Sequence, residues 1–147
     1  MISLIKSVLS KWPRKASTPG REDKPVARVL VVDDNVTVCN VLEEFLRSRG
    51  YDVYTALDGP NAIAKVKELR PHIVLLDIIM PGMGGIEVLK EIKRIDPSVG
   101  VIMLTGVGDD ELGRRTLELG AYEYITKPIN FNYLENALMV KTIDLLG

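Results

Sequence analysis

A run of four apolar residues, Ile73 to Leu76, ends on a single acid, Asp77, and a Pro81-Gly82 pair follows shortly after. The run is short and continuous and contains β-branched residues, which is typical of a strand buried on both faces of a parallel sheet. The Pro-Gly pair predicts a turn just beyond the strand. Asp77 either terminates the strand as a solvated acid or belongs to a site, and the other strands decide between the two.

The same pattern recurs along the chain from Ala27 onward. Strands are predicted at 28–32, 52–56, 73–76, 99–104 and 121–126. Apolar residues at helical spacing between them predict helices from Asn35 to Gly50, 59 to 69, 86 to 95 and 109 to 119, and onward from Asn130. Because right-handed crossovers leave few other topologies, this alternation predicts a parallel sheet with helices on both faces.

Each helix has a predicted inner face. In the first it consists of Val38, Val41, Leu42 and Phe45, with Cys39 as a small packed residue, and in the last of Leu134, Ala137, Leu138 and Met139. Gly113 weakens the helix at 109–119 by about 1 kcal/mol relative to alanine. This helix is therefore expected to be the most mobile.

Polar residues stand where the predicted strands end. Asp33 and Asp34 follow the first strand, Asp77 the third, Thr105 the fourth and Lys127 the fifth. In a parallel sheet the carboxyl ends of the strands share one rim, where ligands bind. Three acids, a hydroxyl and an amine on one rim predict a functional site.

Crowded carboxylates repel one another, so this site is expected to bind a cation or to raise the pKa of an acid. Ligands that are all oxygens favour Mg²⁺ or Mn²⁺ over Zn²⁺. A phosphoryl group there would meet the cation, Lys127, the Thr105 hydroxyl and the backbone N–H of Gly106, which is what phosphoryl transfer requires. Asp77 then fits as the nucleophile.

The motifs at these strand ends resemble those of the receiver domains of two-component response regulators. They are Val-Val-Asp-Asp from Val31, Leu-Leu-Asp-x-x-Met-Pro-Gly-Met-x-Gly from Leu75, Leu-Thr-Gly from Leu104 and Tyr-x-x-Lys-Pro from Tyr124. The resemblance covers about Arg28 to the end. It implies a flavodoxin-like, doubly wound five-stranded parallel sheet of order 2-1-3-4-5 with five helices, preceded here by an amphipathic extension.

By this resemblance Asp77 is the phosphoacceptor, with metal bound by Asp33, Asp34, Asp77 and the backbone carbonyl of Ile79. Thr105 and Tyr124 resemble the family's switch pair, and the Lys127-Pro128 peptide bond is expected to be cis. Phosphate would come from a histidine kinase or a histidine phosphotransfer protein. The response would be a changed protein-binding face formed by the helix at 109–119, the fifth strand and the last helix.

Two residues near the rim are apolar where some relatives carry groups that orient water. They are Ile79, two residues after Asp77, and Val107, two residues after Thr105. We expect a long-lived acyl phosphate. His72, by contrast, begins its strand at the opposite end and is expected to be structural.

Two other functions compete with a signalling module that catalyses only its own phosphorylation and dephosphorylation. A phosphatase with an aspartate nucleophile would need a second acid two residues later, where Ile79 stands. An interaction module without a switch would not need Asp77, Thr105 and Lys127 together.

Composition limits the class of protein. The 147 residues fit one domain, and a formal net charge of -1 argues against nucleic acid as the main partner. The single cysteine allows no internal disulfide, which makes the cytoplasm the expected location. If the chain is the whole protein, its output is protein contact.

Residues 1–25 are expected to be separate from the receiver domain, which we place at 26–147. Ile2, Ile5, Leu9 and Trp12 recur at helical spacing, and a linker rich in Pro, Gly, Ser and charge follows Pro13. The amphipathic helix is too short to span a membrane. It is expected to dock on the chain's own body, on a partner or on a membrane surface.

Overall fold

Five strands and five helices alternate in the part of the chain that the structure, a computed structural model, describes, which is residues 27–146. The predicted amphipathic helix and linker lie outside the described residues. The strands are β1 (Arg28–Val32), β2 (Asp52–Ala56), β3 (Ile73–Asp77), β4 (Gly100–Thr105) and β5 (Glu123–Thr126). The helices are α2 (Val36–Ser48), α3 (Gly59–Leu69), α4 (Gly85–Ile95), α5 (Asp110–Glu118) and α6 (Phe131–Leu146).

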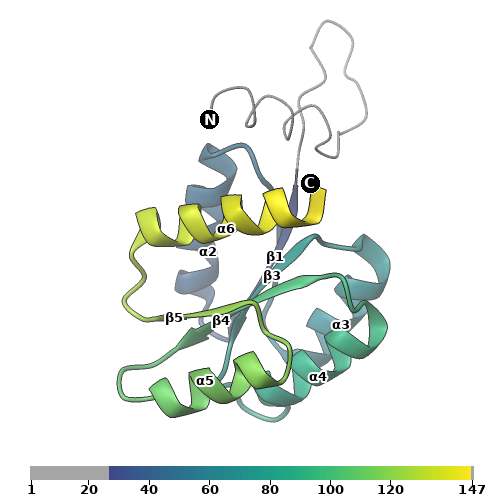
Figure 1. Cartoon of the computed structure of the whole chain (residues 1–147), viewed down its shortest axis with the longest axis vertical. Helices are drawn as coiled ribbons and strands as arrows, with labels where there is room; N and C mark the ends of the chain where they lie inside the picture. Colours follow the sequence, from purple (N-terminus) through teal and green to yellow (C-terminus); the bar gives the residue numbers. More distant parts are fainter. Residues whose placement is uncertain (1–26, 147) are drawn as a thin grey trace, which may run out of the picture.

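The strands form one parallel sheet of order β2-β1-β3-β4-β5, which confirms the predicted topology (Figure 1). Each strand pairs in parallel with its neighbours, and the register places Val32 opposite Leu76 and Leu76 opposite Met103. The carboxyl ends of the strands therefore meet at one rim. None of the helices in residues 27–146 is both long enough and apolar enough to cross a bilayer.

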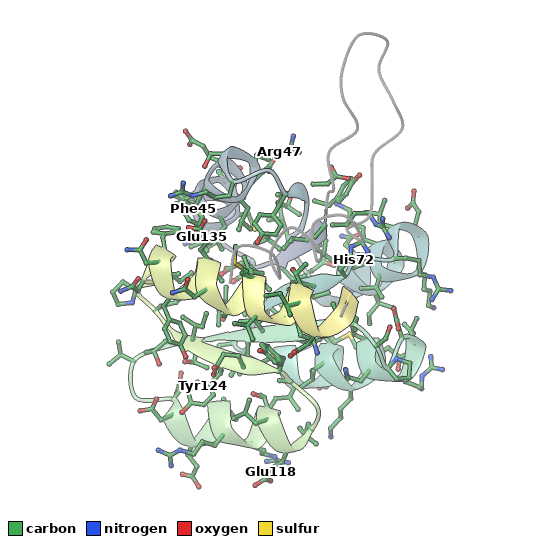
Figure 2. All side chains as sticks on the ribbon, turned by 45° about the horizontal axis from the view of Figure 1, so that its top comes forward. Phe45, Arg47, His72, Glu118, Tyr124 and Glu135 are labelled. Atoms are coloured by element: carbon green, nitrogen blue, oxygen red, sulfur yellow. The ribbon has the colours of Figure 1, made fainter. Side chains whose placement is uncertain are left out.

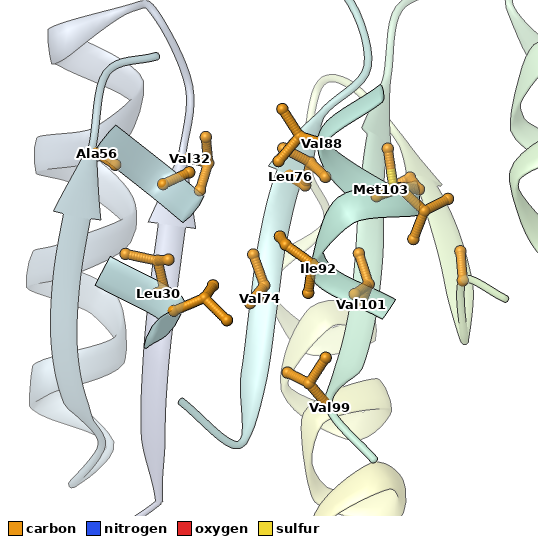
Figure 3. Close-up of a cluster of buried hydrophobic side chains, with 14 of the residues drawn as sticks. Leu30, Val32, Ala56, Val74, Leu76, Val88, Ile92, Val99, Val101 and Met103 are labelled. Atoms are coloured by element: carbon orange, nitrogen blue, oxygen red, sulfur yellow. The ribbon is translucent and has the colours of Figure 1, made fainter. Parts of the chain in front are cut away.

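Side chains alternate between the two faces of the sheet and build two cores. Leu30, Val74 and Val101 face one core, which is closed by α3 and α4 through residues such as Val66, Val88 and Ile92 (Figure 3). Their strand neighbours Val29, Ile73 and Ile102 face the other core, which is closed by α2 and α6 through Leu42, Leu46, Leu134 and Leu138. Because both faces are covered, the central strands are apolar throughout.

The starts of α2 and α6 are fixed by side chains that the sequence identified. The Asn35 side chain accepts hydrogen bonds from the backbone N–H groups of Thr37 and Val38, as a helix N-cap does. Asn130 accepts a hydrogen bond from the backbone N–H of Tyr133 at 3.1 Å at the start of α6. Both predicted caps are confirmed.

Two predicted inward residues face solvent instead. Val41 is 47% exposed and Met139 is 41% exposed. Each stands one position away from a fully buried leucine, Leu42 and Leu138, and so lies about 100° around the helix from the core. The predictions were wrong because each predicted inner face included a residue next to the core leucine that lies outside the buried part of the helix surface.

Candidate functional site

The register of the central strands brings two acids together at the rim. Because Val32 pairs with Leu76, the residues that follow them, Asp33 and Asp77, leave the sheet side by side. Asp33 is fully buried, Asp77 is 8% exposed and Asp34 is exposed. The predicted convergence of acids from β1 and β3 is therefore found.

Lys127, which follows the edge strand β5, reaches these acids along the same rim. Its Nζ donates a hydrogen bond to Asp33 Oδ2 at 2.7 Å and lies 3.6 Å from Asp77 Oδ2. The other Asp33 oxygen, Oδ1, accepts the backbone N–H of Asn35 at 2.9 Å. Both oxygens of Asp33 are thus engaged at short distance. Asp77 Oδ1 accepts the backbone N–H of Ile79 at a longer 3.3 Å, and Asp77 Oδ2 has only the Lys127 ammonium nearby, at 3.6 Å.

The environment shifts the pKa values of two of these groups. Burial raises the pKa of the Asp77 carboxyl, and the negative charge of Asp33 adds to the rise, against the opposing charge of Lys127. Burial lowers the pKa of the Lys127 ammonium, but the Asp33 hydrogen bond and the charges of Asp77 and Asp33 outweigh it and raise the pKa overall. Lys127 is therefore charged, while the Asp77 carboxylate is held at higher energy than in water.

The three acids fit a hard divalent cation. One oxygen from each of Asp33, Asp34 and Asp77 lies within 4.8 Å of the other two. Ligands that are all carboxylate oxygens suit Mg²⁺ or Mn²⁺. The carbonyl of Ile79 belongs to the turn that follows Asp77, and its part as a further ligand stays a prediction.

Thr105 is the last residue of β4 and is completely buried. Its hydroxyl donates to Thr126 Oγ1 at 3.3 Å and lies 3.5 Å from the carbonyl oxygen of Ile125. Both partners belong to β5. The structure thus places Thr105 at the rim with its hydroxyl bonded toward β5, and Gly106, whose N–H was predicted to bind phosphate, follows directly.

Tyr124 on β5 lies between α5 and α6, half-buried, and packs against the core beneath α4 and α5 (Figure 2). A Cβ atom added to Gly113 would lie 2.6 Å from the Tyr124 ring. Gly113 therefore has a packing role in α5, because it makes room for this ring. The predicted greater mobility of α5 stays a prediction.

Replacing Gly113 with alanine is expected to lower the free energy of unfolding by about 1–2 kcal/mol through overpacking, although alanine favours a helix. Chemical denaturation measures the change. The double variant Gly113→Ala/Tyr124→Ala should lose less than the sum of the two single variants, because the added methyl group then has space. Additive losses would show that the ring does not depend on this glycine.

Gly85 holds the segment after Asp77 close to the strand. It is the first residue of α4, and its N–H donates to the carbonyl oxygen of Ile78 at 2.8 Å. A Cβ on Gly85 would lie 2.3 Å from the backbone oxygen of Asp77. Sequence reasoning missed this residue as a support of the site, although its position in the Gly84-Gly85 pair at a predicted helix start was a signal.

A Gly85→Ala substitution should therefore be strongly destabilising, by about 3 kcal/mol, because backbone atoms cannot yield as a side chain can. Gly84→Ala is the matched control, since a Cβ there meets only the Ile78 oxygen at 3.9 Å. Thermal or urea unfolding compares the two variants. Equal stability of both would contradict the close approach of α4 to the Asp77 backbone.

Two apolar side chains stand exposed beside the rim. Ile79 is 61% exposed and Val107 is 83% exposed. Neither side chain carries a group that hydrogen-bonds water. Both follow the acid or hydroxyl of the site by two residues, as the sequence indicated.

Other notable side chains lie outside the site. The N–H of Arg28 donates to His72 Nδ1 at 2.9 Å at the opposite end of the sheet, so His72 acts as a structural acceptor as predicted. Burial, followed by the charge of Arg28, lowers its pKa. Cys39 is buried, and burial raises the pKa of its thiol to about 11, so it packs as a hydrophobe.

The Lys127-Pro128 bond is cis, as expected.

Comparison of the sequence with protein families matches residues 29–139 to the response regulator receiver domain. Among curated proteins, the chain is 39% identical over 110 residues to the transcriptional regulatory protein ZraR of Salmonella typhimurium and 41% identical over 110 residues to ZraR of Klebsiella oxytoca. Each match covers 75% of this chain and 25% of the relative. The chain thus matches about a quarter of the length of these relatives.

Solved structures agree with the sequence match. A response regulator receiver domain protein from Clostridium thermocellum is 32% identical, with a TM-score of 0.76 over 79% of this chain and 94% of that one. A CheY-like receiver domain protein from Methanospirillum hungatei is 30% identical, with a TM-score of 0.78 over 82% of this chain and 96% of that one. Both similarities extend over nearly the full length of the solved chains.

Proposed function

Because this chain belongs to the response regulator receiver domain family, we propose that Asp77 accepts a phosphoryl group from a histidine kinase or a histidine phosphotransfer protein. The observation that carries the proposal is the unequal engagement of the two buried acids. Asp33 uses both oxygens, on Lys127 and on the Asn35 N–H, whereas only Oδ1 of Asp77 accepts a hydrogen bond, from the Ile79 N–H at 3.3 Å, and its Oδ2 lies 3.6 Å from the same ammonium. Asp77 is the carboxylate left for chemistry.

In the proposed reaction an oxygen of the Asp77 carboxylate attacks phosphorus, and a P–O bond forms as the P–N bond of the donor phosphohistidine breaks. The electron pair of that bond stays on the leaving imidazole nitrogen. Lys127 lies close enough to Asp77 to bind the oxygens of the transferred group. Water later hydrolyses the acyl phosphate, which releases inorganic phosphate and restores the free Asp77 carboxylate. In this proposal the chain catalyses only its own phosphorylation and dephosphorylation.

Asp33, Asp34 and Asp77 would hold a divalent cation, Mg²⁺ or Mn²⁺, with the Ile79 carbonyl as a further ligand. When bound, it neutralises charge on the acids and on the phosphoryl oxygens. The chain's own part is to hold the Asp33 carboxylate in place through Lys127 and the backbone N–H of Asn35. The N–H of Gly106 is proposed as a phosphate donor.

Phosphorylation adds negative charge beside Thr105. We propose that the Thr105 hydroxyl then leaves its partners on β5, Thr126 and Ile125, and turns toward the phosphate. The half-buried Tyr124 is free to move into the space released. The face formed by α5, β5 and α6 would thereby change shape for a target protein.

The acyl phosphate should be long-lived, with a lifetime of minutes or more, because Ile79 and Val107 offer no group that orients an attacking water. Decay of the phosphoprotein after removal of the donor measures this. Ile79→Asn should shorten the lifetime, while Val41→Asn, on the exposed side of α2, should not. Loss within seconds from the unmodified chain would contradict the expectation.

The domain assignment and the partners follow from the same proposal. We assign residues 26–147 to the receiver domain and residues 1–25 to an extension, in a protein of the cytoplasm. Transcriptional regulation is named for the ZraR proteins, of which this chain matches about a quarter. We infer a protein target for the α5-β5-α6 face and no contact with nucleic acid by this chain.

Treating the purified chain with acetyl phosphate and Mg²⁺ tests the proposal. A lasting mass gain of one phosphoryl group is expected, and no gain when a chelator is present during the treatment. Steady turnover of a phosphomonoester would indicate a phosphatase instead. No modification under any of these conditions would indicate an interaction module without a switch.

A further inference from the structure

The outward face of α6 carries no charged residue from Phe131 to Val140. Its exposed residues up to position 140 are all uncharged: Asn132, Tyr133, Asn136, Met139 and Val140. Met139 and Val140 are adjacent, and they are 41% and 49% exposed. The exposed residues of α4, by comparison, are Glu87, Lys90 and Arg94. Single exposed apolar residues are common, whereas neighbouring ones such as Met139 and Val140 within an uncharged stretch mark a candidate contact site.

The contacts of Lys141, the next residue along α6, show where this face lies on the domain. Lys141 lies against Gly100, the first residue of β4, and its Nζ lies 4.7 Å from the centre of the Tyr122 ring. Met139 and Val140 therefore lie toward the end of the sheet where the strands begin. This end is opposite the acidic site.

The chain enters the described fold at the same end and on the same side. Ala27 directly precedes β1 and packs in the core cluster that contains Leu138, with Leu145 against it. Figure 1 shows the C-terminal end of α6 close to the start of β1. Whatever precedes Ala27 is thus tethered near the α6 face.

The preceding residues have the chemistry that this face needs. Ile2, Ile5, Leu9 and Trp12 have helical spacing, and residues 1–12 contain two lysines and no acid. Asp144 is the one charged residue among the exposed positions of α6 whose side chains are described. Apolar side chains can cover Met139 and Val140 while a lysine meets Asp144.

The linker is long enough for this contact. Fourteen residues separate Trp12 from Ala27. Fully extended they span up to about 50 Å, against a radius of gyration of about 14 Å for a domain of this size. The linker is therefore long enough to let residues 1–12 reach α6, and it holds them at an effective concentration in the millimolar range.

We propose that residues 1–12 dock through their apolar stripe on the outward face of α6 around Met139 and Val140. A patch this small falls short of the area that a stable dimer buries. A tethered segment needs much less contact, because the tether has already removed most of the entropy of association. The segment of the same chain is therefore favoured over a second copy.

Trp12 is the only tryptophan in the chain, so its fluorescence reports on the segment directly. In the full-length chain its emission should lie at shorter wavelength than in a peptide of residues 1–26, and should not depend on protein concentration. The double variant Met139→Glu/Val140→Glu should shift the emission to that of the peptide. Val41→Glu, at a site of similar exposure on α2, should leave it unchanged.

Each variant is expected to fold because the substituted residues are exposed, and circular dichroism and thermal unfolding test this. Emission equal to that of the peptide in the unmodified chain would overturn the proposal. So would a blue shift that appears only at high protein concentration, which indicates a second copy, or only with anionic vesicles, which indicates a membrane surface. A shift in the unmodified chain that the double variant retains would place the segment elsewhere.

Discussion

Asp77→Asn is expected to abolish phosphorylation completely, because the amide that replaces the carboxylate is not a nucleophile toward phosphorus. Intact-mass measurement after treatment with acetyl phosphate and Mg²⁺ should show no adduct. Asp144→Asn, which removes an exposed acid on α6, is the matched control and should accept phosphate like the unmodified chain. An adduct of equal yield on the Asp77 variant would place the acceptor elsewhere.

The same substitution should stabilise the fold at neutral pH by about 1 kcal/mol, because it removes a carboxylate crowded by Asp33. Burial and the Asp33 charge raise the pKa of Asp77, so the folded state retains the proton to higher pH than the unfolded state does. The ionised carboxylate therefore lowers stability above the raised pKa. The gain from Asp77→Asn should be full there and vanish below the ordinary pKa of an aspartate.

The second large effect is expected from Lys127→Met. Loss of the ammonium should slow phosphorylation by acetyl phosphate by about 10²–10³-fold, as removal of one fixed donor does in other enzymes. It should also lower the free energy of unfolding by about 3 kcal/mol, because fully buried Asp33 loses its hydrogen-bonded counter-charge. Rate measurement and urea unfolding test the two effects separately.

Lys127→Arg is the control, because it keeps the charge and should retain most of the stability. In the Met variant, Mg²⁺ should restore more stability than it adds to the unmodified chain, since a divalent cation can replace the missing charge at the acids. A Met variant with unchanged stability and unchanged phosphorylation rate would show that Lys127 supports neither the fold nor the reaction.

The sheet and its rim could be predicted from sequence because both depend on local patterns. Continuous apolar runs such as 73–76 indicate strands covered on both faces, and polar residues at their ends mark the carboxyl rim. The strand order follows from the resemblance, and the structure confirms it. The predicted convergence of Asp33, Asp77 and Lys127 is found as well.

Details that depend on distances between elements could not be predicted. Lys127 pairs with Asp33 more closely than with Asp77, and these partners are 94 residues apart in the chain. The roles of Gly85 and Gly113 arise from atoms on other segments, the Asp77 backbone and the Tyr124 ring. From sequence alone Gly113 indicated only a weak helix, because helix propensity is local whereas close packing is not.

Element ends and helix faces were the other source of error. β4 begins at Gly100 and includes Thr105, one residue later at each end than predicted, and β5 begins at Glu123 rather than at 121. Val41 and Met139 were placed inward because each neighbours a core leucine. Only the geometry of the packed helices separates the core position from the exposed one next to it.

A crystal structure of the chain with Mg²⁺ and beryllofluoride, a phosphoryl mimic, most directly tests whether one rim holds both the cation and the phosphoryl group. The expected result is beryllofluoride on an oxygen of Asp77 and a cation bound by Asp33, Asp34 and Asp77. The Lys127 ammonium and the Thr105 hydroxyl should both contact the mimic. An adduct on another carboxylate, or a cation bound away from these three acids, would contradict the proposed chemistry.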